Sequence, residues 1–205
     1  MFTGIVSDTT TVRAGQLTDK GRTLSLARPP AWIDLQLGES VSVNGACLTV
    51  AALRDDEFDC FAVPETLDKT SFGTKLPERV NLERSLKVTD RFGGHFVTGH
   101  VDNVSQVTKI DQTDGYWLTV RFNTEFRDLV LYKGSITING VSLTIAEATK
   151  DSLRVTLIPH TLEHTTLSTL QVGDQVNLEF DVLGKYVLNS QKVRSDHATG
   201  SNGDS

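Results

Sequence analysis

The chain has 205 residues, of which 38% are hydrophobic and 22% are charged, and its formal net charge is −6. These proportions are ordinary for a globular protein that folds in water. The acidic balance and the lack of a basic run argue against a nucleic-acid partner, and no stretch of about 18 apolar residues predicts a membrane span.

The N-terminal end and the cysteines indicate the compartment. MFTGIV has neither the basic start nor the apolar length of a signal peptide. The two cysteines, Cys47 and Cys60, have no metal-ligand spacing and are too few for a disulfide scaffold. We therefore expect a reducing, cytoplasmic setting.

The first half of the chain reads as short strands separated by turns. In chain order we expect a strand start, two weakly alternating strands, one helical turn, a hairpin, another strand, a short helix that begins with proline, and a closing strand. These elements cover residues 2–6, 9–14, 22–27, 31–35, 40–50, 57–63, 64–70 and 80–83.

The same order returns about 95 residues later, so the chain contains an internal repeat. GESVSVNGACLTV at 38–50 recurs as KGSITINGVSLTI at 133–145, and PETLDKT at 64–70 recurs as PHTLEHT at 159–165. A duplicated unit of this size predicts two domains, at 1–92 and 93–187. A polar tail at 188–205 follows, and we expect its end to be disordered, although residues 182–193 could form a short helix. Many short strands with regular turns predict an all-β fold of two small antiparallel barrels.

The repeated hairpin has two different faces. Asn44-Gly45 and Asn139-Gly140 predict two-residue type I′ turns, because both turn positions need a positive φ. The turn fixes the register, so side chains that share a face can be read directly. The core face holds Val41, Val43, Ala46, Leu48 and Val50, repeated as Ile136, Ile138, Val141, Leu143 and Ile145. The other face holds Ser40, Ser42, Cys47 and Thr49, repeated as Ser135, Thr137, Ser142 and Thr144. This small, uncharged face is either a solvated surface or a surface that a ligand or another protein covers.

Positions where the repeat fails are candidates for chemistry. Cys47 stands where the second copy has a serine, and is either a buried small hydrophobe or a thiol that donates, accepts or attacks. His100 stands where the first copy has Ile5. It is either a structural histidine whose ring is hydrogen-bonded within the fold or a functional one. His95 and His100 would lie on opposite faces of a strand, which makes them a poor metal pair.

Three basic side chains outside these positions are further candidates. His160 and His164 lie in the second short helix and are either surface residues or site residues. Lys133 precedes the second hairpin and is either solvated or paired with an anionic ligand group. No dinucleotide fingerprint or phosphate-binding loop is present in the sequence.

Taken together, the motifs resemble one family. MFTGIV, VNGACLTV, PETLDKT, VNLER, GGHFVTGHVD, KGSITINGVSLTI, IPHTLEHTTL and VNLEFD resemble the riboflavin synthases of the lumazine-binding, two-barrel type, in order from residue 1 to about 187. The resemblance implies two tandem six-stranded Greek-key barrels with short helices. It also implies a transferase that dismutates two 6,7-dimethyl-8-ribityllumazine molecules, moving a four-carbon unit between them. The products would be riboflavin and 5-amino-6-(D-ribitylamino)uracil, in the last step of riboflavin biosynthesis, without a metal or an organic cofactor.

The resemblance also assigns site residues. Ser40, Cys47 and His100 match positions tied to catalysis in the family, with His100 expected to transfer protons and Cys47 with Ser40 expected to supply a nucleophile or position a water. Substrate-binding positions of the N-terminal barrel would be Gly4, Ile5, Val6, Cys47, Leu48, Thr49, Phe61, Ala62, Val63, Pro64, Glu65 and Thr66. Those of the C-terminal barrel would be Gly99, His100, Val101, Lys133, Ser142, Leu143, Thr144, Thr156, Leu157, Ile158, Pro159, His160 and Thr161.

The family's site lies between the N-terminal barrel of one subunit and the C-terminal barrel of another, usually in a trimer. Its members often end in an apolar helix that bundles the trimer, whereas residues 188–205 are short and polar here. The resemblance therefore implies a homotrimer that could be weakly associated. The alternative function is a non-catalytic lumazine- or flavin-binding protein, like the fluorescent accessory proteins that share the fold.

Overall fold

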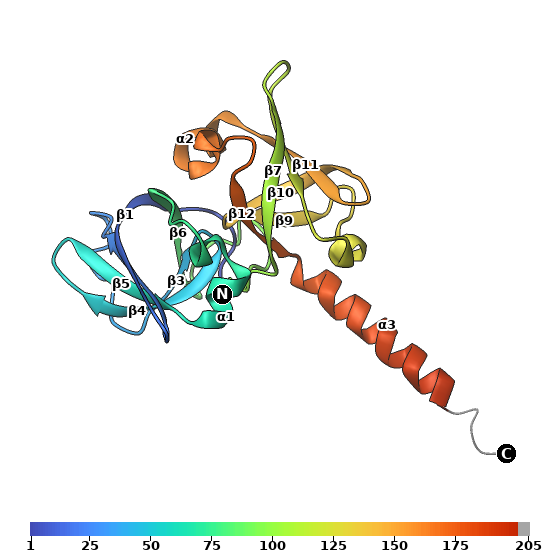
Figure 1. Cartoon of the computed structure of the whole chain (residues 1–205), viewed down its shortest axis with the longest axis horizontal. Coiled ribbons are helices and arrows are strands. Elements are labelled where there is room, and N and C mark those ends of the chain that lie inside the picture. Colours follow the sequence, from blue (N-terminus) through green and yellow to red (C-terminus); the bar gives the residue numbers. More distant parts are fainter. Residues whose placement is uncertain (201–205) are drawn as a thin grey trace.

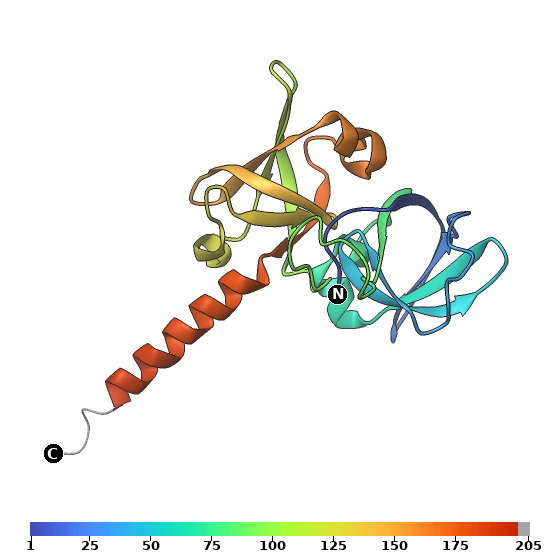
Figure 2. The ribbon, with the colours of Figure 1, turned by 180° about the vertical axis from the view of Figure 1, so that it is seen from behind.

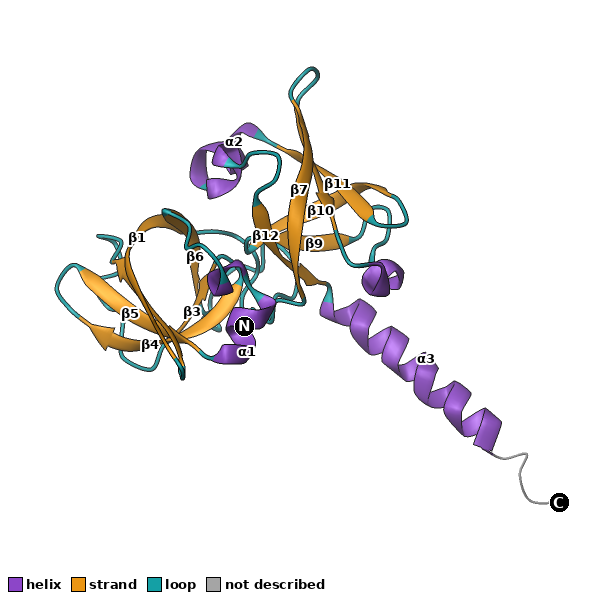
Figure 3. Ribbon diagram, viewed as in Figure 1, coloured by secondary structure: helices purple, strands orange, loops and turns teal. Residues whose placement is uncertain are grey.

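The computed structural model describes the backbone of residues 1–200 and the side chains of residues 1–194. Strands form most of the structure and the helices are short except for the last one (Figure 3). The predicted disorder at the end of the chain concerns residues outside this range. No helix of the described residues is long and apolar enough to cross a membrane.

The N-terminal half is a closed six-stranded antiparallel barrel with strand order β1-β2-β5-β4-β3-β6. Its strands are β1 (Asp8–Thr18), β2 (Gly21–Ala27), β3 (Ser40–Val43), β4 (Ala46–Leu53), β5 (Glu57–Ala62) and β6 (Arg79–Arg84). The short helix α1 (Pro64–Lys69) and the 3-10 turn η1 (Ser71–Gly73) connect β5 to β6. Proline opens α1, as predicted, and Thr70 caps η1 by accepting a hydrogen bond from the Phe72 amide.

The C-terminal half repeats this barrel with strand order β7-β8-β11-β10-β9-β12. Its strands are β7 (Asn103–Asp111), β8 (Tyr116–Arg121), β9 (Ser135–Ile138), β10 (Val141–Ala148), β11 (Ser152–Leu157) and β12 (Gln175–Phe180). The short elements are α2 (Pro159–His164) and the 3-10 turns η2 (Thr124–Leu129) and η3 (Thr166–Thr169). The prediction of two antiparallel barrels related by an internal repeat is confirmed.

Both hairpins have the predicted geometry. All four turn residues have positive φ, between 44° and 82°. In the first hairpin Val43 pairs with Ala46 and Ser40 with Thr49, and the second hairpin has the equivalent pairs. The ten residues predicted to face inward all belong to the two hydrophobic cores. Burial of the apolar side chains of the two cores is the main stabilising contribution to each barrel.

Three expected elements differ in the structure. Residues 2–6 form an isolated bridge between Phe2 and Val97 instead of a strand, because the next amides bind a carboxylate. Residues 31–35 form successive turns, not a helix, and they bury Trp32 in the N-terminal core. The helix expected at 182–193 is α3 (Val182–Gly200), which extends further and points away from both barrels in two opposite views (Figures 1 and 2).

Four buried asparagines join the barrels in a nearly symmetric network. The Asn44 side-chain oxygen accepts a hydrogen bond from the backbone amide of Asn81 at 2.7 Å. The Asn139 side-chain oxygen accepts one from the backbone amide of Asn177 at 2.8 Å. The side-chain nitrogens cross between the barrels, from Asn81 to the Asn139 carbonyl and from Asn177 to the Asn44 carbonyl. Because every such bond satisfies a buried polar group, the barrels have a defined relative position.

Candidate functional site

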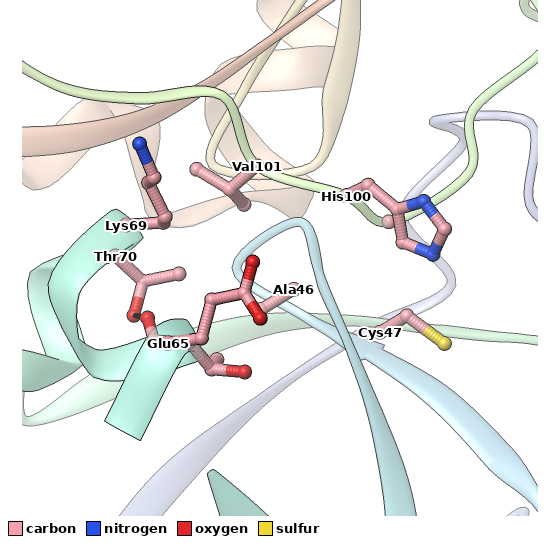
Figure 4. Close-up of a pocket in the computed structure, with 9 residues that line it drawn as sticks. Ala46, Cys47, Glu65, Lys69, Thr70, His100 and Val101 are labelled. Carbon is pink, nitrogen blue, oxygen red and sulfur yellow. Dashed lines mark hydrogen bonds between the residues drawn. The ribbon is translucent and has the colours of Figure 1, made fainter. Parts of the chain in front are cut away.

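A pocket of about 390 Å³ lies beside the first hairpin, at the junction of the two halves (Figure 4). Strand β4 and helix α1 provide two of its sides, and the third comes from the segment that precedes β7. Its lining residues are Ala46, Cys47, Glu65, Thr66, Lys69, Thr70, Gly99, His100 and Val101. His100 and Cys47 lie next to each other at one end of the pocket, and Glu65 and Lys69 lie toward the other end.

The segment from Thr98 to Val101 crosses from the C-terminal half onto the N-terminal hairpin. The Cys47 amide donates to the Gly99 carbonyl at 2.8 Å. A Cβ atom on Gly99 would lie 2.6 Å from the Cys47 Cβ, and Gly99 has a φ of +80°, so this approach needs glycine. Val101 then packs against the N-terminal core, which holds the segment in place.

A buried glutamate binds the other side of this crossing segment. Glu179, only 2% exposed at the end of β12, accepts from the Thr98 amide at 2.7 Å and the Gly99 amide at 2.9 Å. The Thr98 hydroxyl donates to the same carboxylate at 2.6 Å. Burial raises the pKa of Glu179, and these hydrogen bonds oppose that rise.

The N-terminal end of the chain makes the equivalent crossing in the opposite direction. The Ser142 amide donates to the Gly4 carbonyl at 2.7 Å, and Glu83 accepts from the Thr3 and Gly4 amides. Burial likewise raises the pKa of Glu83. Val6 packs against the C-terminal core.

The structure places each of the two predicted crossing ligand segments against the hairpin of the opposite barrel. Residues Gly4, Ile5 and Val6 lie against the C-terminal hairpin, and residues Gly99, His100 and Val101 lie against the N-terminal hairpin. Each segment is bound to the last strand of its own half while its other side contacts the opposite barrel. Local sequence patterns carry no information on such pairing.

Histidine and serine meet at the C-terminal hairpin. The His95 Nδ1 lies 2.8 Å from the Ser142 hydroxyl, and the His95 amide donates to the Thr3 carbonyl. Burial lowers the pKa of His95, while the charge of Asp181 opposes this. This contact was not predicted, because no spacing in the repeat places His95 beside Ser142. Among the described residues, no cluster of three or more His, Cys, Asp or Glu side chains could hold a metal ion.

The second short helix carries histidines at the repeat positions of two pocket residues. His160 and His164 correspond to Glu65 and Lys69, and their rings stack with centroids 4.2 Å apart. Lys69 and Thr70 line the first pocket but were not predicted. Their spacing of four residues from Glu65 and Thr66 on α1 places them on the same side of that helix, which was the available signal.

The remaining predicted residues separate into exposed and buried positions. Ser40 lies half-buried on β3, opposite Thr49, and is not among the residues that line the pocket. Lys133 is exposed with a φ of +64°, and its ammonium lies over the Tyr132 ring. The exposed or half-exposed candidates are Thr49, Phe61, Val63, Pro64, Thr66, Ser142, Thr144, Thr156, Ile158, Pro159 and Thr161. Four others, Leu48, Ala62, Leu143 and Leu157, have side chains in the cores, so a ligand outside the barrel meets only their backbone.

The face expected to be covered is covered partly by the protein itself. Ser42 is 3% exposed and Thr137 is 1% exposed. The Ser42 hydroxyl lies under Gly140 of the opposite hairpin, and Thr137 donates to the Glu179 carbonyl. The other members of each face are half-buried or exposed and stay open to a ligand: Ser40, Cys47 and Thr49 on the first hairpin, and Ser135, Ser142 and Thr144 on the second.

Comparison with known proteins agrees with this architecture. The lumazine binding domain family matches the chain twice, over residues 3–85 and 98–181. The fold is similar to the crystal structure of LumP complexed with riboflavin, with 26% identity, a TM-score of 0.80, and coverage of 88% of this chain and 99% of that chain. The fold and the two family matches thus define a protein with two lumazine-binding domains.

Curated relatives narrow the class further. Riboflavin synthase of Bacillus amyloliquefaciens is 41% identical over 189 residues, covering 91% of this chain and 88% of the relative. Riboflavin synthase of Mycobacterium tuberculosis (strain ATCC 25618 / H37Rv) is 39% identical over 194 residues, covering 91% of this chain and 96% of the relative. The chain belongs to the riboflavin synthase family.

Proposed function

We propose that this protein converts two molecules of 6,7-dimethyl-8-ribityllumazine into riboflavin and 5-amino-6-(D-ribitylamino)uracil. The observation that carries the proposal is a pair of equivalent hairpins with different chemistry beside them. Cys47 and His100 flank the first hairpin, whereas Ser142, His95 and Ile5 flank the second. A dismutation needs such a difference, because one molecule donates four carbons and the other accepts them.

The side chains of His100 and Cys47 at the first pocket suit proton transfer and nucleophilic addition. The 7-methyl protons of a lumazine are acidic because the resulting carbanion delocalises into the heterocycle, so a modest base removes one. The exposed imidazole of His100 is that base, or returns the proton later. The Cys47 thiol, with Ser40 nearby on the paired strand, adds to the acceptor ring or positions the water that does so. Stacking two rings in one site supplies much of the remaining rate by proximity.

Other residues around the two hairpins complete the proposed binding surface. Thr66 on α1 offers its hydroxyl group to a ribityl chain in the first pocket, and Thr161 holds the equivalent place on α2. The hydroxyls of Thr70 and Thr165 are instead bound to backbone groups of their own segments. Lys133 lies on the C-terminal barrel, where an ammonium would favour an anionic ring. No organic cofactor is part of this proposal.

We infer an equivalent pocket beside Ser142 and His95 at the second hairpin, called the C-terminal pocket, as the counterpart of the N-terminal pocket beside Cys47 and His100. The complete site then lies between two copies of the chain, with the N-terminal pocket of one copy facing the C-terminal pocket of another. The family resemblance supports a homotrimer. Exposed Leu183, Tyr186 and Val187 on the projecting helix α3 give such an assembly an apolar surface. The free cysteines suit a cytoplasmic enzyme.

Complementation tests the shared site. A His100→Ala chain would have a defective N-terminal pocket, and a Ser142→Val chain a defective C-terminal pocket. Mixing the two under conditions that exchange subunits should restore activity, because some sites then combine two intact pockets. Activity that stays at the level of the separate variants would contradict a site shared between copies.

One other function has support. The similar solved structure is a LumP complex with riboflavin, so a protein of this fold can be a binder. Incubation with 6,7-dimethyl-8-ribityllumazine alone separates the two functions. Riboflavin that accumulates far beyond one molecule per chain supports the enzyme, and a stable one-to-one fluorescent complex without riboflavin would overturn it.

A further inference from the structure

The C-terminal helix α3 is fixed to the barrel by an ion pair near its start. The Lys185 ammonium lies 2.6 Å from the Asp102 carboxylate, and both side chains are less than one-third exposed. The same Asp102 oxygen accepts from the Phe180 amide at 2.9 Å, so it joins the end of β12 to the helix. Asp181 begins the helix by accepting from the Leu183 amide.

Asp102 directly follows the crossing segment, Thr98 to Val101, that lines the N-terminal pocket. Its amide donates to the Leu178 carbonyl at 2.9 Å. Four residues earlier, Thr98 is bound by Glu179, and the charge of Lys185 also acts on that carboxylate. The segment is therefore held to β12 at both ends, and the residues between these attachments include His100 at the pocket.

The first half of the chain has no such ion pair. Ser7 holds the position of Asp102, and its amide and hydroxyl both donate to the Leu82 carbonyl. Its crossing segment, at Gly4, is held by Glu83 without a helix attached beyond it. The link between a helix and a pocket is thus specific to the pocket that contains His100 and Cys47.

We propose that Lys185 is a positioning residue that couples α3 to the N-terminal pocket through Asp102 and Glu179. The proposal rests on the proposed function only for its effect on turnover. The helix projects from the barrel in both views, and this ion pair lies near its start, where the helix meets the barrel (Figures 1 and 2). Displacement of the pair loosens the crossing segment, moves His100 and uncovers Cys47.

The test measures the alkylation rate of Cys47 in the full chain, with iodoacetamide and peptide mass spectrometry. Cys60 is fully buried and reports global unfolding in the same sample. Lys185→Met removes the charge, Lys185→Arg retains it, and Lys150→Met is a matched loss of charge in the turn between β10 and β11.

Lys185→Met should accelerate Cys47 alkylation about fivefold. This is the factor by which the loss of a partly exposed ion pair can increase the population of a locally opened state. Lys185→Arg and Lys150→Met should react like the wild type, and Cys60 should stay unreactive in all three. Turnover by Lys185→Met should fall mainly in kcat, with Lys185→Arg restoring it. An unchanged Cys47 rate in Lys185→Met would overturn the proposal.

Asp102→Asn reaches the same contact from the other side and keeps an oxygen for the Phe180 amide. It should accelerate Cys47 alkylation as much as Lys185→Met does, and the double variant should be no faster than either single variant. Equal, simultaneous exposure of Cys47 and Cys60 in both single variants would also overturn the coupling. A wild-type chain that makes no riboflavin would refute the proposed function, while the alkylation rates would still decide the coupling.

Discussion

Replacement of the two buried glutamates by glutamine tests the crossed arrangement of the pockets. Glu179 and Glu83 each receive three hydrogen bonds, two from amides and one from a threonine hydroxyl. Glutamine has nearly the same shape, but one of its two terminal atoms is a donor. At least one protein donor would then face another donor inside the structure.

The magnitude follows from these contacts. A hydrogen bond to a charged acceptor contributes roughly 1.5–3 kcal/mol, and a buried donor left without an acceptor costs about 1–3 kcal/mol. Removing a charge whose burial is unfavourable returns part of this loss, as the raised pKa of each glutamate indicates. We expect a net loss of about 2 kcal/mol in the free energy of unfolding for either variant.

The local effect should differ between the two variants. Glu179→Gln, in the C-terminal barrel, should loosen Gly99 and increase the alkylation rate of Cys47 in the N-terminal barrel. Glu83→Gln should loosen Gly4 and leave Cys47 unchanged. A faster Cys47 reaction in Glu83→Gln than in Glu179→Gln would refute the crossed arrangement.

Three further variants test other contacts. Gly45→Ala should lower the free energy of unfolding by more than about 2 kcal/mol, because its Cβ would lie 2.8 Å from the Gly140 amide nitrogen. A Cβ on Gly38 would meet nothing within 4 Å, so Gly38→Ala should show only the cost of its positive φ, about 1 kcal/mol. His95→Gln should reduce the loss of thermal stability that the wild type shows below about pH 6.5. Because the pKa of His95 is lowered in the folded state, the unfolded state binds the proton first, and wild-type stability falls as the pH decreases from that value. Equal slopes of melting temperature against pH in the wild type and the variant would contradict this. A fragment of residues 1–92 contains all six strands of its barrel and should fold. Sedimentation should show a symmetric dimer, since a second copy of the fragment can repeat the contacts of the missing half. A folded monomer would show that the two halves do not substitute for each other.

The barrels and their cores could be predicted because the signals are local. Alternation of apolar residues on either side of Asn44-Gly45 defines the pairing, the face and the turn together. The repeat then transfers the same interpretation to residues 133–145 without further assumptions. Cys47 and His100 were recognised as candidates because each breaks the repeat.

The arrangement of the pockets could not be predicted in the same way. Gly4 contacts Ser142, and Gly99 contacts Cys47, and in neither pair does a spacing or a periodicity reveal the partner. The uncharged face of the hairpin was expected to be either solvated or covered, and the structure divides it. Ser42 is covered by the other barrel, Cys47 borders a pocket, and Thr49 is exposed.

The stoichiometry of the reaction tests the central claim most directly. The purified chain should be incubated with 6,7-dimethyl-8-ribityllumazine as the only substrate, and substrate, riboflavin and 5-amino-6-(D-ribitylamino)uracil should be quantified by chromatography over many turnovers. A dismutation consumes two substrate molecules for each riboflavin and releases one pyrimidinedione with it, and we predict that ratio. Riboflavin formed in any other proportion, or substrate that is bound and recovered unchanged, would contradict the account.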